Sequence, residues 1–337
     1  MSRPRRALAL VLAAGALFAA LVLVGDVRAV RDRLGGFGWW AFAAALGLAV
    51  TNYGLRFARW QLYLAHRELV VPPRTSALVF VAGFSMAVTP GKLGELVKSY
   101  LLRQLVAIPV ARSASIVIAE RVSDLLALLL LAAIGVGLYG IATEVALATA
   151  VVLAVAFVFL LWRRLGRATI DLLTRPRRLA RLRRPLHEIY DGLAALGQPS
   201  VLTWSTALAA AAWACEGVGF ALIVGAFPGA HVDLGVAIFI YAATTVAGAL
   251  SFLPGGLGVT EGAMTLLLVE NASGVDLGTA TAATILTRLA TLWFGVGLGL
   301  VALAWARRRA PVEVDDDAPA PDATPDAGAA PVPGRED

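Results

Sequence analysis

Two copies of the pattern Pro-Gly-x-Leu-Gly, each followed shortly by a glutamate, have the residue types and spacing to bind an anion. Proline and glycine stop a helix. A helix that restarts after such a break presents free N–H groups and a partial positive charge. We therefore expect both breaks to place half-helix ends at a binding site. The residues expected to form the breaks are Pro90, Gly91, Gly94, Pro254, Gly255, Gly256 and Gly258.

Charged residues accompany both breaks. Lys92 adds a positive charge to the first, and Glu95 and Glu261 follow the first and the second. Arg121 and Arg288 come 30 and 33 residues after the glycine of each Pro-Gly pair. Ionisable residues inside apolar spans are costly and mark function by default. The predicted substrate-binding residues are Lys92, Glu95, Glu120, Arg121, Asp124, Glu261 and Arg288.

Some of these charges also have a structural explanation. Arg121 and Asp124 lie three residues apart on one helix and could neutralise each other. Arg288 has no acid within helical reach, so it needs a partner on another helix, either Glu261 or Glu216. For Glu216, an interhelical hydrogen bond and a transport role are equally open.

The elements that must position these residues are membrane helices. Of the 337 residues, 59% are hydrophobic and only 15% are charged, and the mean hydropathy is +0.77. A soluble domain carries about 25% charged residues, so soluble and nucleic-acid-binding classes are excluded. One cysteine and three scattered histidines exclude a disulfide framework and a multi-cysteine metal site. We expect no metal, no cofactor and no catalytic residues.

The chain is predicted to be an all-α polytopic membrane protein with about six full spans, each near the length that crosses a bilayer. The predicted spans are residues 7–25, 37–55, 113–139, 145–162, 201–227 and 281–306.

Arginines orient these spans through the positive-inside rule. Nine arginines and one acid lie between residues 163 and 184, which makes this loop cytoplasmic. The loop 56–75, with Arg56 and Arg59, and both termini are also predicted to be cytoplasmic. Residues 1–309 would form the transmembrane domain, and the acidic, Pro/Ala-rich residues 310–337 a disordered tail.

The two broken segments complete the predicted topology. The orientation of the neighbouring spans requires residues 76–102 to enter and leave on the cytoplasmic side, and residues near 235–275 on the outer side. We therefore expect two oppositely directed re-entrant helical hairpins related by an inverted repeat. Such repeats place a transporter's substrate site near the membrane midplane.

These segments carry a resemblance to a known family. The stretches VTPGKLGE at 88–95, ERVSDL at 120–125 and LPGGLGVTE at 253–261 resemble the flippase-like transmembrane region of lysylphosphatidylglycerol synthases and its stand-alone relatives. The similarity runs over about residues 5–308. It implies a polytopic domain that moves lipids between leaflets. The aminoacyl-transfer domain of the full-length synthases is missing here, so transferase activity is not expected.

The leading functional hypothesis is a flippase or translocator for a phospholipid or lipid-linked substrate. Its headgroup, expected to be anionic, would bind near Lys92, Arg121 and Arg288. The alternatives are a membrane enzyme acting on a lipid headgroup and a non-transporting partner of a lipid-modifying or glycosyl-transferring enzyme. The expected location is the plasma membrane, in a bacterium, with membrane lipids as partners and no nucleic acid.

Overall fold

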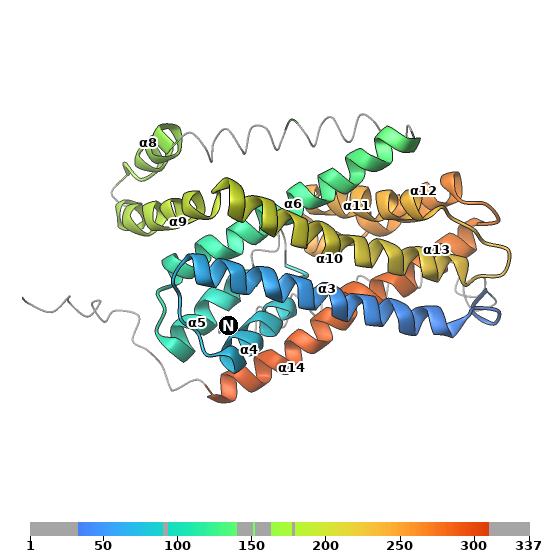
Figure 1. Cartoon of the computed structure of the whole chain (residues 1–337), viewed down its shortest axis with the longest axis horizontal. Coiled ribbons are helices and arrows are strands. Elements are labelled where there is room, and N and C mark those ends of the chain that lie inside the picture. The colour runs from blue at the N-terminus through green and yellow to red at the C-terminus, as the bar shows by residue number, and fades with distance from the viewer. Residues whose placement is uncertain (1–32, 90–93, 140–150, 152–162, 177–178, 310–337) are drawn as a thin grey trace, which may run out of the picture.

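The computed structural model describes residues 33–89, 94–139, 151, 163–176 and 179–309, and it shows a bundle of helices (Figure 1). The elements in chain order are α3 (Trp39–His66), α4 (Pro73–Gly83), η1 (Phe84–Met86), α5 (Val97–Val106), α6 (Val110–Tyr139), α8 (Arg163–Leu173), η3 (Ala180–Leu182), α9 (Arg183–Leu196), α10 (Pro199–Gly225), α11 (Leu234–Leu250), η4 (Pro254–Gly256), α12 (Val259–Asn271), α13 (Leu277–Arg288), η5 (Leu289–Trp293) and α14 (Phe294–Arg309). The predicted span 7–25 and tail 310–337 lie outside the described residues, as does the predicted span 145–162 except for residue 151.

Two continuous helices in the described part of the chain are long and apolar enough to cross a membrane. One is α10, and the other is the run Leu277–Arg309, which α13, the π-helical η5 and α14 form together. α10 begins with Pro199, whose missing N–H costs nothing in a first turn. α13 begins after Asp276, whose carboxylate accepts a hydrogen bond from Thr279 N–H at 2.8 Å.

The loop predicted directly after the span 37–55 is wrong. α3 continues to His66, so Arg56 and Arg59 lie within a helix and not in a loop. Both arginines are buried, and so are Trp60 and Tyr63. These positions recur every three to four residues, which is the period of one helix face. The helix therefore continues because its charged residues share a buried face with aromatic ones.

The arginine-rich residues 163–184 are also not a simple loop. α8 covers the first half, and η3 leads into α9 in the second half. α8 leaves Leu172 and Leu173 exposed, and Arg167 on the same helix forms an ion pair with Asp191 of α9 at 2.8 Å. α9 in turn packs on α6. This segment is thus helical and amphipathic.

Both segments that were predicted to be broken are interrupted between two helices. α4 and η1 end at Met86, and α5 begins only at Val97. Pro90, Gly91 and Lys92 of this first break lie outside the described residues, whereas Gly94 is described. Glu95 belongs to a short 3-10 turn at residues 94–96.

The second break separates α11 from α12 and contains η4. Gly255, Gly256 and Gly258 have φ angles of 64°, 67° and 87°. Glycine adopts these angles readily because it has no Cβ atom. The helix is therefore interrupted here at residues whose backbone conformation favours glycine.

Two large apolar cores lie in the described part of the chain, one around each broken segment. In the first, Phe80 of α4 and Leu101 of α5 pack with Trp60 of α3. In the second, Ile240 of α11 packs with Phe220 of α10. α3 packs along α10, and α14 packs on α4 and η1 (Figure 1).

A small third cluster joins the two breaks. Val88 of the first break packs with Leu257 of the second and with Val296 of α14. An ideal Cβ on Gly255 would lie 3.5 Å from Val88 Cα, so the two backbones approach closely. Two segments far apart in the sequence therefore meet at the centre of the protein.

Candidate functional site

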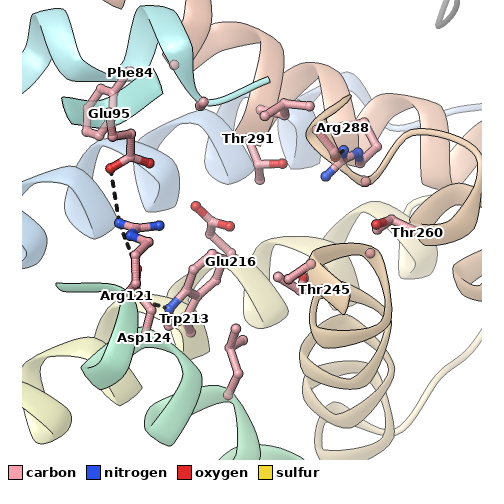
Figure 2. A pocket seen from close by; sticks show the side chains of 18 of the residues that line it. Phe84, Glu95, Arg121, Asp124, Trp213, Glu216, Thr245, Thr260, Arg288 and Thr291 are labelled. Atoms are coloured by element: carbon pink, nitrogen blue, oxygen red, sulfur yellow. Dashed lines mark hydrogen bonds and ion pairs between the residues drawn. The ribbon is translucent and has the colours of Figure 1, made fainter. Parts of the chain in front are cut away.

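A cavity of about 300 Å³ lies where the two breaks meet (Figure 2). Residues from both breaks and from α3, η1, α6, α10, α11, α12, α13, η5 and α14 line it. Its polar and indole side chains are Tyr53, Arg56, Thr89, Glu95, Arg121, Asp124, Trp213, Glu216, Tyr241, Thr245, Thr260, Arg288 and Thr291.

One side of the cavity carries a shared ion pair. Nη2 of Arg121 lies 3.1 Å from Oε2 of Glu95 and 3.0 Å from Oδ2 of Asp124. Glu95 and Asp124 are buried. Arg121 therefore links the first break to α6, and its contact with Asp124 confirms the predicted pairing on one helix.

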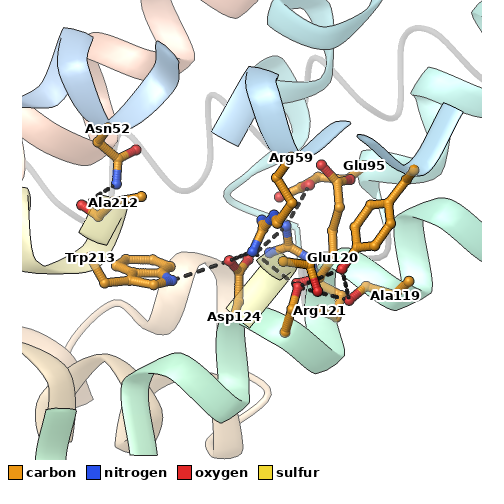
Figure 3. A network of polar contacts seen from close by, with 12 residues as sticks. Asn52, Arg59, Glu95, Ala119, Glu120, Arg121, Asp124, Ala212 and Trp213 are labelled. Atoms are coloured by element: carbon orange, nitrogen blue, oxygen red, sulfur yellow. Dashed lines mark hydrogen bonds and ion pairs between the residues drawn. The ribbon is translucent and has the colours of Figure 1, made fainter. Parts of the chain in front are cut away.

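Further buried polar residues contact Glu95 and Asp124 (Figure 3). Oδ1 of Asp124 accepts hydrogen bonds from Arg59 Nη1 at 2.7 Å and from Trp213 Nε1 at 3.2 Å. Lys98 forms an ion pair with Glu120, and its Nζ lies 3.6 Å from Glu95 Oε2. Buried charges need partners of this kind because an isolated charge in a low-dielectric interior is very costly.

The other side of the cavity is held by Arg288. Its Nε donates to Glu261 Oε1 at 2.6 Å, and its Nη2 donates to the Gly255 carbonyl at 2.8 Å. Oε2 of Glu261 accepts from Gly258 N–H at 2.7 Å, so the glutamate also caps α12. Of the two partners predicted for Arg288, the structure shows Glu261.

Hydroxyl groups and one carboxylate occupy the middle of the cavity. In Figure 2 Glu216 lies between Arg121 and Arg288. Its Oε2 accepts a hydrogen bond from the Tyr241 hydroxyl. The Tyr53 hydroxyl donates to the carbonyl of Thr291, in the π-helical η5, at 2.8 Å. π-helical turns of this kind are frequent at functional sites.

Fourteen residues were predicted for the breaks and the binding site, and the eleven that the structure describes differ in their positions relative to the cavity. Six line the cavity, namely Glu95, Arg121, Asp124, Gly255, Gly256 and Arg288. Glu120 and Glu261 hold Lys98 and Arg288 instead. Gly94, Pro254 and Gly258 belong to the breaks without lining the cavity. Gly94 N–H bonds to Thr89 Oγ1 at 2.8 Å.

Sequence reasoning missed Arg56, which it placed in a loop, and left Glu216 undecided. Both line the cavity. The helical period that joins Arg56 to Trp60 and Tyr63 was the signal that could have found the arginine. No group of three or more His, Cys, Asp or Glu residues within the described ranges could hold a metal ion.

The described residues form helices, two of which are long and apolar enough to cross a membrane, and this arrangement is consistent with a membrane protein. The family of the protein follows from a comparison of its sequence with models of known families. Residues 7–299 match the model of the lysylphosphatidylglycerol synthase TM region, so the chain belongs to that family. It is also 26% identical over 234 residues to a UPF0104 membrane protein of Methanothermobacter thermautotrophicus. That alignment covers 63% of this chain and 68% of the relative.

Proposed function

We propose that this protein is a lipid translocator that moves a phospholipid or lipid-linked headgroup through the cavity between the two breaks. The observation that carries the proposal is the meeting of both breaks at one charge-lined cavity. Broken backbone inside a bilayer is tolerated only where protein or a water-filled cavity satisfies it. In transporters, sites between discontinuous helices hold the substrate near the midplane.

The cavity lining supports an anionic headgroup. Three cationic side chains reach it, from Arg56, Arg121 and Arg288. Guanidinium groups form bidentate hydrogen bonds with phosphate and carboxylate oxygens. A headgroup bound here would be dehydrated and would exchange its water for these donors.

Apolar residues at the rim support a lipid over a water-soluble solute. Leu250, Phe252 and Leu253 line the cavity and are also exposed, Phe252 to 71%. Acyl or prenyl chains could leave the cavity across such a rim and stay in the bilayer. The headgroup alone would then cross the polar interior.

The two apolar cores suggest how the headgroup would change sides. Each core surrounds one broken segment, and Val88, Leu257 and Val296 join the two halves. The halves would rock about the cavity as re-entrant, inversely related units, and the joining cluster would open and close access. The plasma membrane is the proposed location, with α8, α9 and both termini on the cytoplasmic side.

Leaflet exchange in liposomes tests the proposal. The purified protein is reconstituted with fluorescent anionic or zwitterionic lipids, and dithionite quenching follows exchange. We expect exchange above the rate of empty liposomes for the wild type. Glu95→Gln and Arg288→Ala should reduce it towards the empty-liposome rate.

Arg181→Gln is the matched control, because Arg181 is exposed and lies outside the cavity lining. Wild-type exchange with equal rates in all variants would reject the cavity as the route. No exchange of either lipid would reject translocation of these lipids and favour the enzyme or partner functions.

A further inference from the structure

Arg56 is a buried cation of the cavity, and no ion pair within 4.0 Å joins it to a carboxylate of the described residues. Its side chain lines the cavity while the residue is only 7% exposed. Its guanidinium carbon lies 5.3 Å from the ring centre of Phe84 and 5.9 Å from that of Trp213. Its Nε atom is buried and has no hydrogen-bond partner.

The other cations around the cavity differ from Arg56 because each forms an ion pair. Each has a carboxylate oxygen within 4.0 Å, as the contacts of Arg59, Lys98, Arg121 and Arg288 show. Arg59 is the closest comparison, since it lies one helical turn further along α3 and pairs with Asp124 at 2.7 Å. No described carboxylate, Glu216 included, comes within that distance of Arg56.

A buried guanidinium without an ion-pair partner is costly, and the two aromatic rings offset only part of that cost. An anion in the cavity would complete the coordination. Contacts with two rings would restrict the guanidinium group and so prepare its donors for a bidentate contact. A phosphate group offers such oxygens, and in a lipid it lies where the headgroup meets the chains.

We propose that Arg56 is the phosphate-binding residue of the cavity and that the phosphate is that of the translocated lipid headgroup. The lipid source of the phosphate rests on the proposed function, whereas phosphate binding at Arg56 does not. Arg121 and Arg288 are engaged by Glu95, Asp124 and Glu261, so they shape the cavity around this contact.

The melting temperatures of variants distinguish an arginine that binds a ligand from one that stabilises the fold. In delipidated protein, Arg56→Met should leave the melting temperature unchanged or raise it, because it removes an unpaired buried charge. Arg59→Met should lower the melting temperature by several degrees, because it breaks the pair with Asp124. A fall for Arg56→Met as large as that for Arg59→Met would overturn the proposal.

Binding to the full-length protein in detergent tests the ligand directly. The probes are inorganic phosphate and dihexanoyl phosphatidylglycerol below its micelle concentration, measured by calorimetry. Arg56→Met and Arg56→Gln should weaken binding about tenfold or more, the scale of lost charged hydrogen bonds. Arg56→Lys should retain part of the affinity, and Arg181→Gln should retain all of it.

The two probes separate the sources of the phosphate. Stronger binding of the lipid than of inorganic phosphate, lost in Arg56→Met, supports a headgroup site. Equal Arg56-dependent binding of both supports the phosphate site but assigns it to free phosphate. Binding that is the same in wild type and Arg56→Met, or absent from the wild type, overturns the proposal. Neither binding measurement requires leaflet exchange. A failed exchange assay would therefore not change the conclusion about phosphate binding at Arg56.

Discussion

Arg288 donates a hydrogen bond from Nε to Oε1 of Glu261 at 2.6 Å and so ties the end of α13 to the first turn of α12. The same arginine donates to the Gly255 carbonyl, and the same glutamate accepts from Gly258 N–H. One ion pair thus satisfies two backbone groups within the second break. These groups have no regular helical partners, and both side chains are largely buried.

The first break has a comparable pair. Glu95 follows that break and lies 3.1 Å from Arg121 on the long helix after it. In both halves, a glutamate beside the break is therefore held by an arginine from the next long helical run. The second pair is the simpler one to test, because Arg121 also contacts Asp124.

Removing Arg288 should destabilise the fold. Arg288→Met leaves the buried carboxylate of Glu261 without its ion-pair partner, which typically costs about 3–5 kcal/mol. The free energy of unfolding is measured in detergent with a chemical denaturant. The double variant Arg288→Met/Glu261→Met should recover part of the loss, since it buries no unpaired charge. A change within about 0.5 kcal/mol for the single variant would show that the pair is not structural.

A cross-link between the two breaks should stop the exchange of lipids between leaflets. Val88 and Leu257 pack in one cluster. Their replacement by cysteine in a Cys215→Ser background allows a short bifunctional maleimide to join them. We expect the cross-linked protein to lose leaflet exchange, because the halves can no longer separate at the cavity. Each single-cysteine variant treated with the same reagent is the control, and full exchange in the cross-linked protein would exclude this motion.

Close packing of α14 on η1 should not tolerate a larger residue at position 299. A Cβ atom on Gly299 would lie 2.2 Å from the Ser85 nitrogen. Gly299→Ala should therefore cost about 1–3 kcal/mol by forcing the backbones apart. Gly297, two residues earlier on α14, has open space around it. Gly297→Ala should be neutral or stabilising by about 0.5–1 kcal/mol, because alanine favours helix. Equal melting temperatures for the two variants would contradict this packing.

The contact between α8 and α9 should weaken in acid. Asp171 Oδ1 is hydrogen-bonded to His187 Nε2 at 2.9 Å and accepts from Arg183 Nε at 2.8 Å. These two hydrogen bonds lower the pKa of the Asp171 carboxyl below its ordinary value. Because the folded-state pKa is the lower one, the stabilisation is present above the unfolded-state pKa of about 3.9. It is lost as the pH falls through the lowered value.

Spin labels on the two helices can follow this change. Exposed positions Ala168 on α8 and Arg184 on α9 accept cysteine labels in a Cys215→Ser background. The distance distribution should broaden below about pH 4. Asp171→Asn should show the broad distribution already at pH 7. A distribution that does not change with pH in the labelled parent would show that this carboxylate does not hold the two helices together.

The positions of the helix breaks followed from local sequence signals. The Pro-Gly motifs predicted helix breaks at the right segments, because proline and glycine act on the backbone wherever the rest of the fold lies. The lack of an acid within helical reach of Arg288 required a partner on another helix, and Glu261 fills that place. The family also followed from these motifs.

The tertiary structure alone decided which charges are buried and what they face. The sequence predicted that the span ends before Arg56 and Arg59, because a charged residue in an apolar segment is costly unless it has partners. Those partners cannot be identified from the local sequence. In the structure, Asp124 comes from α6 to Arg59, and Phe84 and Trp213 come from η1 and α10 to Arg56. Such contacts join residues distant in sequence. The sequence therefore determined where the helices break, whereas helix packing determined which arginine forms no ion pair with the carboxylates that the structure describes.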